Sequence, residues 1–178
     1  MFIKSQFNQE YKINSILKRR SVRQYTDQKV SDEVIKKLLE TAMSAPSAGN
    51  ERPWHFIIVK DKKTLSRLSQ THRDASMIEQ AQAAIVVCGD INLEIKKGMW
   101  VQDCAAATEN ILIEVEENNL GAVWVGIYPR EDRVGYVKKA FDLPVNIIPL
   151  CIIPVGYPAE RFDTPNRYDG TRVHYENW

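Results

Sequence analysis

The hydrophobic positions along the chain follow two different spacings. Apolar side chains at i, i+3 and i+4 predict helices over 31–45, 64–82, 99–119 and 131–141, the second in one or two pieces. Continuous apolar runs predict strands over 54–59, 83–89, 121–128 and 147–155. The first of these runs is expected to be buried on both faces. Strands that alternate with helices predict an α/β or α+β domain with a central sheet.

The two ends of the chain differ from this pattern. Apolar residues at Tyr11, Ile13, Ile16 and Leu17 indicate a further short helix near the start. The last segment, 156–178, is polar, rich in turn residues and aromatic. A loose tail seldom keeps its aromatic side chains exposed, so this tail is expected to pack on a neighbouring subunit. The chain as a whole, 1–178, is expected to form a single domain.

Composition narrows the classes of function. The net charge is +1 and 44% of the 178 residues are hydrophobic, which gives no indication of a broad basic face for nucleic acid. Three cysteines in apolar stretches fit buried, reduced thiols in a cytoplasmic protein. The histidines are far apart in sequence, so no metal site is expected. No apolar run approaches membrane-spanning length, and the N-terminal residues lack the apolar core of a signal peptide.

One short stretch departs from this neutral background. Lys18, Arg19, Arg20 and Arg23 gather around a hydroxyl, Ser21, just after the first helical pattern. One interpretation is a solvated basic turn that complements the helix dipole. The other is an anion site, because arginine pairs with phosphate oxygens at two points. The chain has no GxGxxG and no GxxxxGK[ST] motif, so side chains rather than a glycine loop would hold a phosphate.

Three blocks of sequence together resemble the FMN-dependent nitroreductase family. They are RRSVRQY at 19–25, SAPSAGNERPWHFIIV at 44–59, and QDCAAATENILIEVEENNLGAVWVGIY at 102–128. The first block alone is weak, but their order and spacing extend over nearly the whole chain. The resemblance implies an α+β nitroreductase-like fold, with a central mixed β-sheet flanked by helices. It also implies a homodimer that exchanges C-terminal tails and holds FMN at the interface.

The resemblance implies a function and a set of site residues. Family members take hydride from NADH or NADPH and pass electrons to nitroaromatics, quinones or similar small acceptors in a ping-pong cycle. The residues that match the segment gripping the FMN phosphate and ribityl chain are Arg19, Arg20, Ser21 and Arg23. The residues that match a loop from the second subunit are Pro46, Ser47, Ala48 and Asn50. Val125 and Gly126 match the strand end along the isoalloxazine ring, and Arg167 matches a late basic residue that returns to the phosphate.

The chemistry would belong to the cofactor, so no catalytic acid or base and no metal ligand is assigned. Asp103 and Glu109 on the long predicted helix are expected to face solvent or to be paired. The segment 90–97 leaves little room for the extra helices that roof the pocket in larger members, and no basic side chain is located at the flavin edge. Two alternatives stay open: an FMN storage or sensing protein without turnover, and a flavin-modifying or dehalogenating enzyme of the same fold. A nucleic-acid module is disfavoured by the neutral charge.

Overall fold

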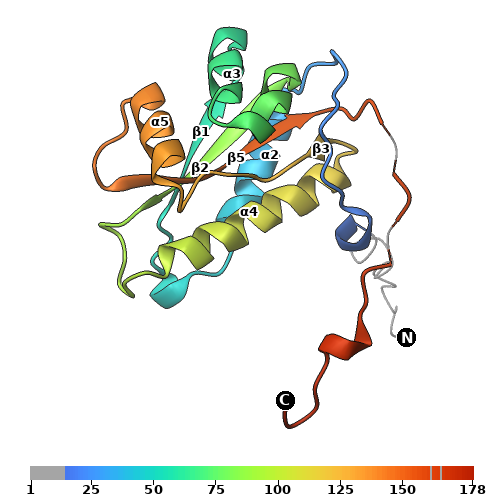
Figure 1. Ribbon diagram of the computed structural model, residues 1–178, viewed down its shortest axis with the longest axis vertical. Helices are drawn as coiled ribbons and strands as arrows, with labels where there is room; N and C mark the ends of the chain where they lie inside the picture. The colour runs from blue at the N-terminus through green and yellow to red at the C-terminus, as the bar shows by residue number, and fades with distance from the viewer. Residues whose placement is uncertain (1–14, 161, 165) are drawn as a thin grey trace, which may run out of the picture.

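The computed structural model describes residues 15–160, 162–164 and 166–178 (Figure 1). Its helices are α2 (Asp32–Met43), α3 (Lys62–Ser69), α4 (Trp100–Glu117) and α5 (Glu131–Phe141), with short 3-10 turns η1 (Ala48–Asn50), η2 (Arg73–Gln80) and η3 (Gly170–Arg172). The strands are β1 (Trp54–Val59), β2 (Ala83–Asp90), β3 (Gly121–Ala122), β4 (Val125–Gly126) and β5 (Ile147–Gly156). Of the predicted first helix, 15–18 is helical. Tyr11 and Ile13 lie outside the described residues.

The strands form one sheet in the order β1-β2-β5-β3, and β4 also pairs with β5. The named strands pair antiparallel, and Ser21 adds a parallel bridge to Ala122, so both directions occur. The β2–β5 register shifts between Val87 and Cys88, opposite Pro149. A bulge there accommodates a proline, which cannot donate to the ladder, inside a long strand.

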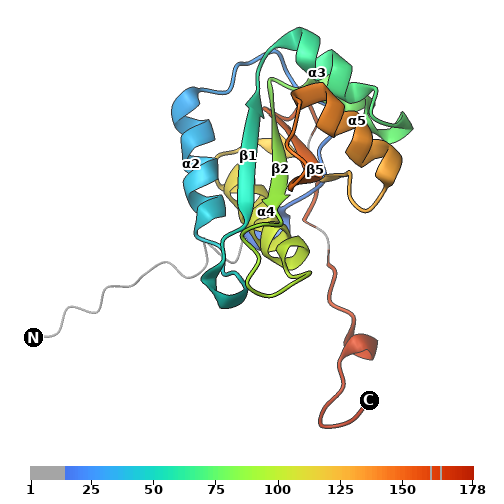
Figure 2. The ribbon, with the colours of Figure 1, turned by 90° about the vertical axis from the view of Figure 1, so that its left-hand side faces the viewer.

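Helices cover both faces of this sheet. Figure 2 shows α2 on one side and α3 and α5 on the other. Alternate residues of β2 face the two layers: Ile85 and Val87 join the core under α2 and α4, whereas Val86 and Cys88 join the core under α3, η2 and α5. The sheet is therefore the middle layer of a three-layer domain. No helix in the described part of the chain is both long and apolar enough to cross a membrane.

The predicted elements form with two differences. The prediction for 121–128 was one strand, but the structure has two pieces that share the same register on β5. That register places Pro154 opposite Val123, and a residue without an amide hydrogen interrupts the ladder. The run 54–59 is only partly buried, because β1 is an edge strand and the prediction of burial on both faces is wrong there. The region 64–82 forms two pieces, α3 and η2, which is one of the two arrangements predicted for it.

Helix α2 begins and ends at residues that its sequence marks. The Ser31 hydroxyl accepts a hydrogen bond from the amide of Val34, and Asp32 and Glu33 occupy the first turn. The helix buries Leu38 and its neighbours against α4. The segment 46–53 follows and connects α2 to β1. It lies against the start of α4, where the Ala48 amide reaches Asp103.

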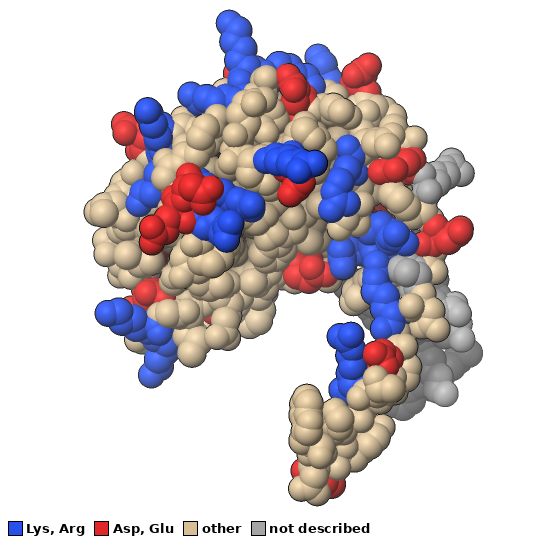
Figure 3. Space-filling view, viewed as in Figure 1, with Lys and Arg blue, Asp and Glu red and all other residues tan. Residues whose placement is uncertain are grey.

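The C-terminal tail leaves the body of the molecule after β5. Figures 1 and 2 show it running away from the three layers, and Figure 3 shows a hollow between tail and body with basic side chains near its root. Tyr175 and Trp178 are 83% and 101% exposed. These aromatic residues belong to the tail that is predicted to pack on a second subunit, and that packing stays a prediction.

Candidate functional site

The arginine stretch, residues 19–23, is fixed to the sheet by its apolar neighbours. Val22 and Tyr25 are buried, and the Val22 amide donates to the Ala122 carbonyl at 2.9 Å. This close approach needs glycine on the sheet: a Cβ at Gly121 would lie 2.6 Å from the Val22 side chain. Because Val22 points inward, its two neighbours Ser21 and Arg23 are turned toward the surface.

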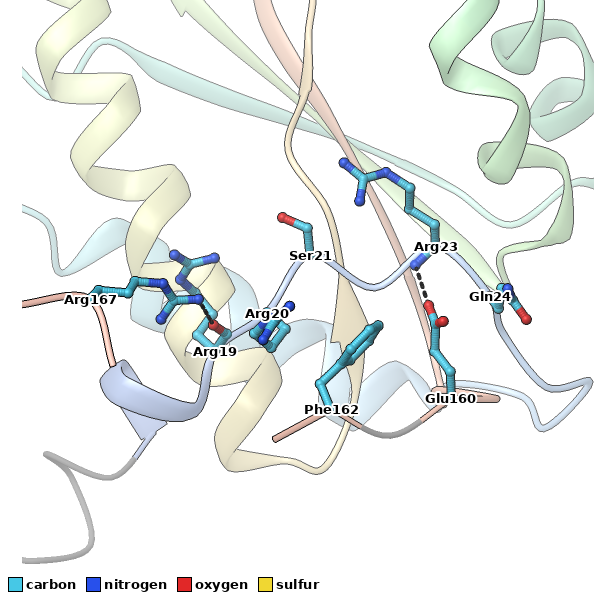
Figure 4. Close-up of a pocket in the computed structure, with 8 residues that line it drawn as sticks. All are labelled: Arg19, Arg20, Ser21, Arg23, Gln24, Glu160, Phe162 and Arg167. Carbon is cyan, nitrogen blue, oxygen red and sulfur yellow. Dashed lines mark hydrogen bonds between the residues drawn. The ribbon is translucent and has the colours of Figure 1, made fainter. Parts of the chain in front are cut away.

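Each arginine of this region has a different set of contacts (Figure 4). The Arg19 Nε lies 3.2 Å from Glu109 Oε1, and Arg20 lies over the Phe162 ring at 4.9 Å from its centroid. Arg167, from the tail, donates to the carbonyls of Leu17 at 3.3 Å and Arg19 at 3.0 Å. The Arg23 guanidinium has no hydrogen bond or ion pair within the described part of the chain.

These side chains line a pocket of about 470 Å³. Four arginines face a single carboxylate there, and the lining residues are Arg19, Arg20, Ser21, Arg23, Gln24, Glu160, Phe162 and Arg167. Such an excess of guanidinium groups around an open space suits an anion with several oxygens, such as a phosphate, which arginine can pair with at two points. The structure thus brings together five of the residues predicted to contact the cofactor phosphate.

A second pocket, of about 320 Å³, begins on the other side of Arg23. Its lining includes the predicted pair Val125 and Gly126 together with Trp124 and η2 residues. A Cβ at Gly126 would meet nothing within 4 Å, so the strand end is open. Arg23 lines both pockets and joins the anion site to a wall of exposed backbone, which is the arrangement that a flat ring carrying a phosphate chain requires.

Two basic residues of this second pocket were missed from the sequence. His72 and Arg73, at the start of η2, lie in the lining with Gly126. Burial lowers the pKa of His72, helped by the charge of Arg133, so the ring is neutral. The His72 Nδ1 accepts from the Asp74 amide at 3.2 Å, which leaves Nε2 as the protonated nitrogen. That buried Nε2 has no partner among the described residues. No sequence pattern indicates that residues 72–73 and Gly126 line the same pocket.

The predicted loop residues Pro46, Ser47, Ala48 and Asn50 lie elsewhere. They line neither pocket within this chain. The loop packs on the first turn of α4, where the Ala48 amide donates to Asp103 Oδ1 at 2.9 Å. Figure 1 places η1 and the arginine stretch at opposite ends of α4. A second subunit is therefore needed if both groups are to contact one ligand.

The loop has an unusual backbone of its own. Gly49, Asn50 and Arg52 all have positive φ, at 57°, 59° and 45°. Glycine and asparagine adopt this region readily, whereas arginine does not, so surrounding contacts must hold it. The Arg52 amide donates to Ser47 Oγ at 3.0 Å, and its Nε donates to Asn50 Oδ1 at 2.8 Å. Hydrogen bonds within the loop therefore fix its backbone conformation.

Comparison with known proteins decides the family. The model of the nitroreductase family matches residues 16–101 and 70–157, which together span most of the chain.

The chain belongs to the nitroreductase family.

Individual relatives agree with this assignment. A protein of Methanothermobacter thermautotrophicus, described as a candidate NADH dehydrogenase/NAD(P)H nitroreductase, is 45% identical over 93% of this chain and 87% of that protein. A crystal structure from Parabacteroides distasonis with the same description has a TM-score of 0.90 and 42% identity, covering 94% of this chain and 98% of the other. An FMN-dependent nitroreductase of Clostridium difficile has a TM-score of 0.88 and 31% identity, covering 93% and 99%.

These likenesses confirm the predicted family and the α+β nitroreductase-like fold. In this nitroreductase the arginine pocket and the Gly126 wall fit FMN on the chain's own geometry. The cationic pocket matches the phosphate, the open backbone at Gly126 leaves space for a flat ring, and the unpartnered His72 Nε2 lies in the same region. The individual residue roles stay predictions.

Proposed function

We propose that this chain uses FMN to transfer electrons from NAD(P)H to a nitroaromatic, a quinone or a similar small acceptor in a ping-pong cycle. The observation that supports this most directly is the continuity of the two pockets through Arg23. One is rich in guanidinium groups, and the other is bounded by the open strand end at Gly126.

The family and the relatives determine the enzyme class. The chain is an NAD(P)H-dependent flavin oxidoreductase with FMN as cofactor, as its family and its full-length relatives indicate. Bound FMN supplies the hydride acceptor and the electron donor of the reaction. The acceptor class, the ping-pong order and the residue roles are the proposed part. A cytoplasmic location, inferred from the cysteines, also stays a prediction.

The chain's own residues act by binding and orientation. Arg19, Arg20 and Arg23, with Arg167 from the tail, hold the phosphate by charge-assisted hydrogen bonds. Ser21 contributes a hydroxyl to the same pocket. Val125 and Gly126 lie along the ring, and the absence of a Cβ at Gly126 allows close approach of the ring to backbone.

We also propose that the working unit is a homodimer. The loop residues Pro46, Ser47, Ala48 and Asn50 lie away from the pockets of their own chain, so they would serve the site of the partner. The exposed aromatic tail supports the same assembly, because Tyr168, Tyr175 and Trp178 present a large apolar area to solvent in one subunit.

The test is a visible absorption spectrum of the purified protein, repeated under anaerobic conditions after NADH and then NADPH. We expect a yellow protein that bleaches with one or both reductants. Initial rates at several acceptor concentrations should then give parallel double-reciprocal lines. A yellow protein that stays yellow would favour the storage alternative, and a flavin spectrum that does not return when air is readmitted would favour the flavin-modifying one. A colourless protein that takes up no FMN would overturn the proposal.

A further inference from the structure

Two buried carboxyl groups meet at the base of the 46–50 loop. Glu51 follows η1 directly, and Asp103 belongs to the first turn of α4. Their residues are only 8% and 5% exposed. Acidic side chains are seldom this buried without a partner, and neither residue lines the arginine pocket or the Gly126 pocket. Asp103 was expected to face solvent or be paired, and burial excludes the first possibility.

One oxygen of each carboxyl group fixes a backbone segment. Glu51 Oε2 accepts from the amides of Ile95 at 2.7 Å and Lys96 at 2.9 Å. Asp103 Oδ1 accepts from the Ala48 amide at 2.9 Å. The pair therefore connects the 46–50 loop, the 94–98 loop and α4. The two loops also touch, because a Cβ at Gly49 would lie 3.8 Å from Ile95.

The other oxygen of each group is buried without a hydrogen-bond partner in the described part of the chain. These two atoms are Glu51 Oε1 and Asp103 Oδ2. The two carboxyl groups influence each other's pKa, and a proton held between them would give both of these oxygens a partner. Two buried carboxylates in contact would repel, so one shared proton is the state that satisfies both groups.

The surroundings decide which group holds the proton. Burial raises the pKa of Asp103, and the nearby carboxylates of Glu51 and Glu94 add to the effect. The Lys96 amide, followed by the Ile95 amide, lowers the pKa of Glu51 against the cost of its burial, and the Lys96 charge helps. Glu94 itself accepts from the amides of Gly98 and Trp100 at the start of α4. The pKa of Asp103 is therefore raised and that of Glu51 lowered, which favours Asp103 as the group that holds the proton.

We propose that Glu51 and Asp103, sharing one proton, are positioning residues that hold the 46–50 loop in the shape required for FMN binding in the partner subunit's site. This inference rests on the proposed function. Neither side chain touches the cofactor. Loss of the shared proton would place two charges in contact, push Asp103 from Glu51, and release the Ala48 amide. FMN binding should then weaken as pH rises through the pKa of Asp103.

The test measures FMN binding to the full-length apoprotein by flavin fluorescence from about pH 5 to about pH 10. In the wild type we expect the Kd to rise about tenfold once the shared proton is lost. Asp103→Asn should keep the low-pH Kd and remove this rise, because an amide donates to Glu51 and accepts from Ala48 at every pH. Asp103→Ala should bind FMN about tenfold more weakly at all pH values. Glu40→Gln, which removes an exposed carboxylate of α2, is the matched control and should follow the wild type.

Hydrogen exchange of the apoprotein gives a second measurement that does not depend on activity. Amides in 46–53 and 91–98 should exchange faster in Asp103→Ala than in the wild type. Amide exchange is catalysed by base, so its rate rises with pH in both proteins. The ratio of the wild-type rate to the Asp103→Asn rate removes this common increase, and we expect the ratio to rise with pH only in these segments. If Asp103→Ala does not fold, the Asp103→Asn profile decides alone.

The outcomes separate the two levels of the proposal. A wild type that binds FMN with the same pH dependence as Asp103→Asn overturns the positioning role and leaves the proposed function intact. Unchanged FMN affinity in a folded Asp103→Ala has the same meaning. A wild type that binds no FMN at any pH overturns the proposed function and this inference with it.

Discussion

The arginine stretch 19–23 and the loop 46–50 lie at different ends of α4, and they are held in different ways. The arginine stretch is pinned by two apolar anchors, Val22 and Tyr25, while its charged groups stay at the surface around an open pocket. The loop is held by the buried carboxyl groups of Glu51 and Asp103, and two of its residues, Gly49 and Asn50, have positive φ. One region keeps its polar groups available, and the other uses polar groups to fix its backbone.

This difference teaches how a split site can be prepared before its ligand binds. The arginine side chains can adjust to an anion, since Arg23 has no competing ion pair in the described chain. The loop offers backbone and short side chains, whose positions are set before binding. We expect the first region to provide affinity for the phosphate and the second to provide shape, and the following experiments test that division.

The largest effect is expected from removing two arginines. Arg19→Ala together with Arg23→Ala should weaken FMN binding about 100-fold, or about 2.7 kcal/mol, because two charge-assisted contacts to phosphate are lost. Riboflavin, which lacks the phosphate, should bind the variant as it binds the wild type. Fluorescence titration with both flavins measures this. Lys36→Ala with Lys63→Ala removes two exposed cations elsewhere and should change neither affinity. An equal loss for FMN and riboflavin would contradict the phosphate assignment.

The sequence was sufficient for most of the fold and for one half of the candidate site. The helical and strand patterns predicted the elements because burial dominates them, and the arginines lie in one pocket partly because they are neighbours in sequence. Arg167 reaches that pocket through two backbone carbonyls, which no periodicity indicates. The gap between β3 and β4 depends on Pro154 of another strand. The Glu51–Asp103 pair joins positions far apart in sequence, so only the packed structure identifies it.

A mixed dimer tests whether the two regions serve one site from different chains. Ser47→Ala with Asn50→Ala should weaken FMN binding about tenfold, since two side-chain contacts are lost. When this loop variant and the Arg19→Ala/Arg23→Ala variant are unfolded and refolded together, half of the dimers are mixed. Each mixed dimer then has one intact site, so about one quarter of all sites should regain wild-type affinity in a C2 dimer. No recovery, with mixed dimers demonstrated by mass, would place both regions in one chain's site.

Alanine substitutions at two glycines on the same edge of the sheet should separate an effect on FMN binding from an effect on stability. Gly121→Ala should destabilise the protein by about 1–3 kcal/mol, because its Cβ would lie 2.6 Å from the Val22 side chain that anchors the arginine stretch. Gly126→Ala meets no protein atom within 4 Å and should leave the melting temperature nearly unchanged. Its methyl group would instead occupy the space assigned to the flavin ring and weaken FMN binding. Thermal unfolding of the apoproteins and FMN titration measure the two effects. Normal FMN affinity in Gly126→Ala would remove this strand end from the site.

The smallest effect is expected from salt. The arginine pocket is open to solvent, so its attraction for a phosphate dianion should be screened, whereas contacts made by the loop should not be. Raising NaCl from about 0.05 M to about 0.5 M should increase the Kd of FMN a few-fold and leave that of riboflavin constant. The Ser47→Ala/Asn50→Ala variant should keep the same salt dependence, and the Arg19→Ala/Arg23→Ala variant should lose most of it. If the loop variant lost the salt dependence instead, the phosphate would be held at the loop end of α4, and the division between affinity and shape would have to be reversed.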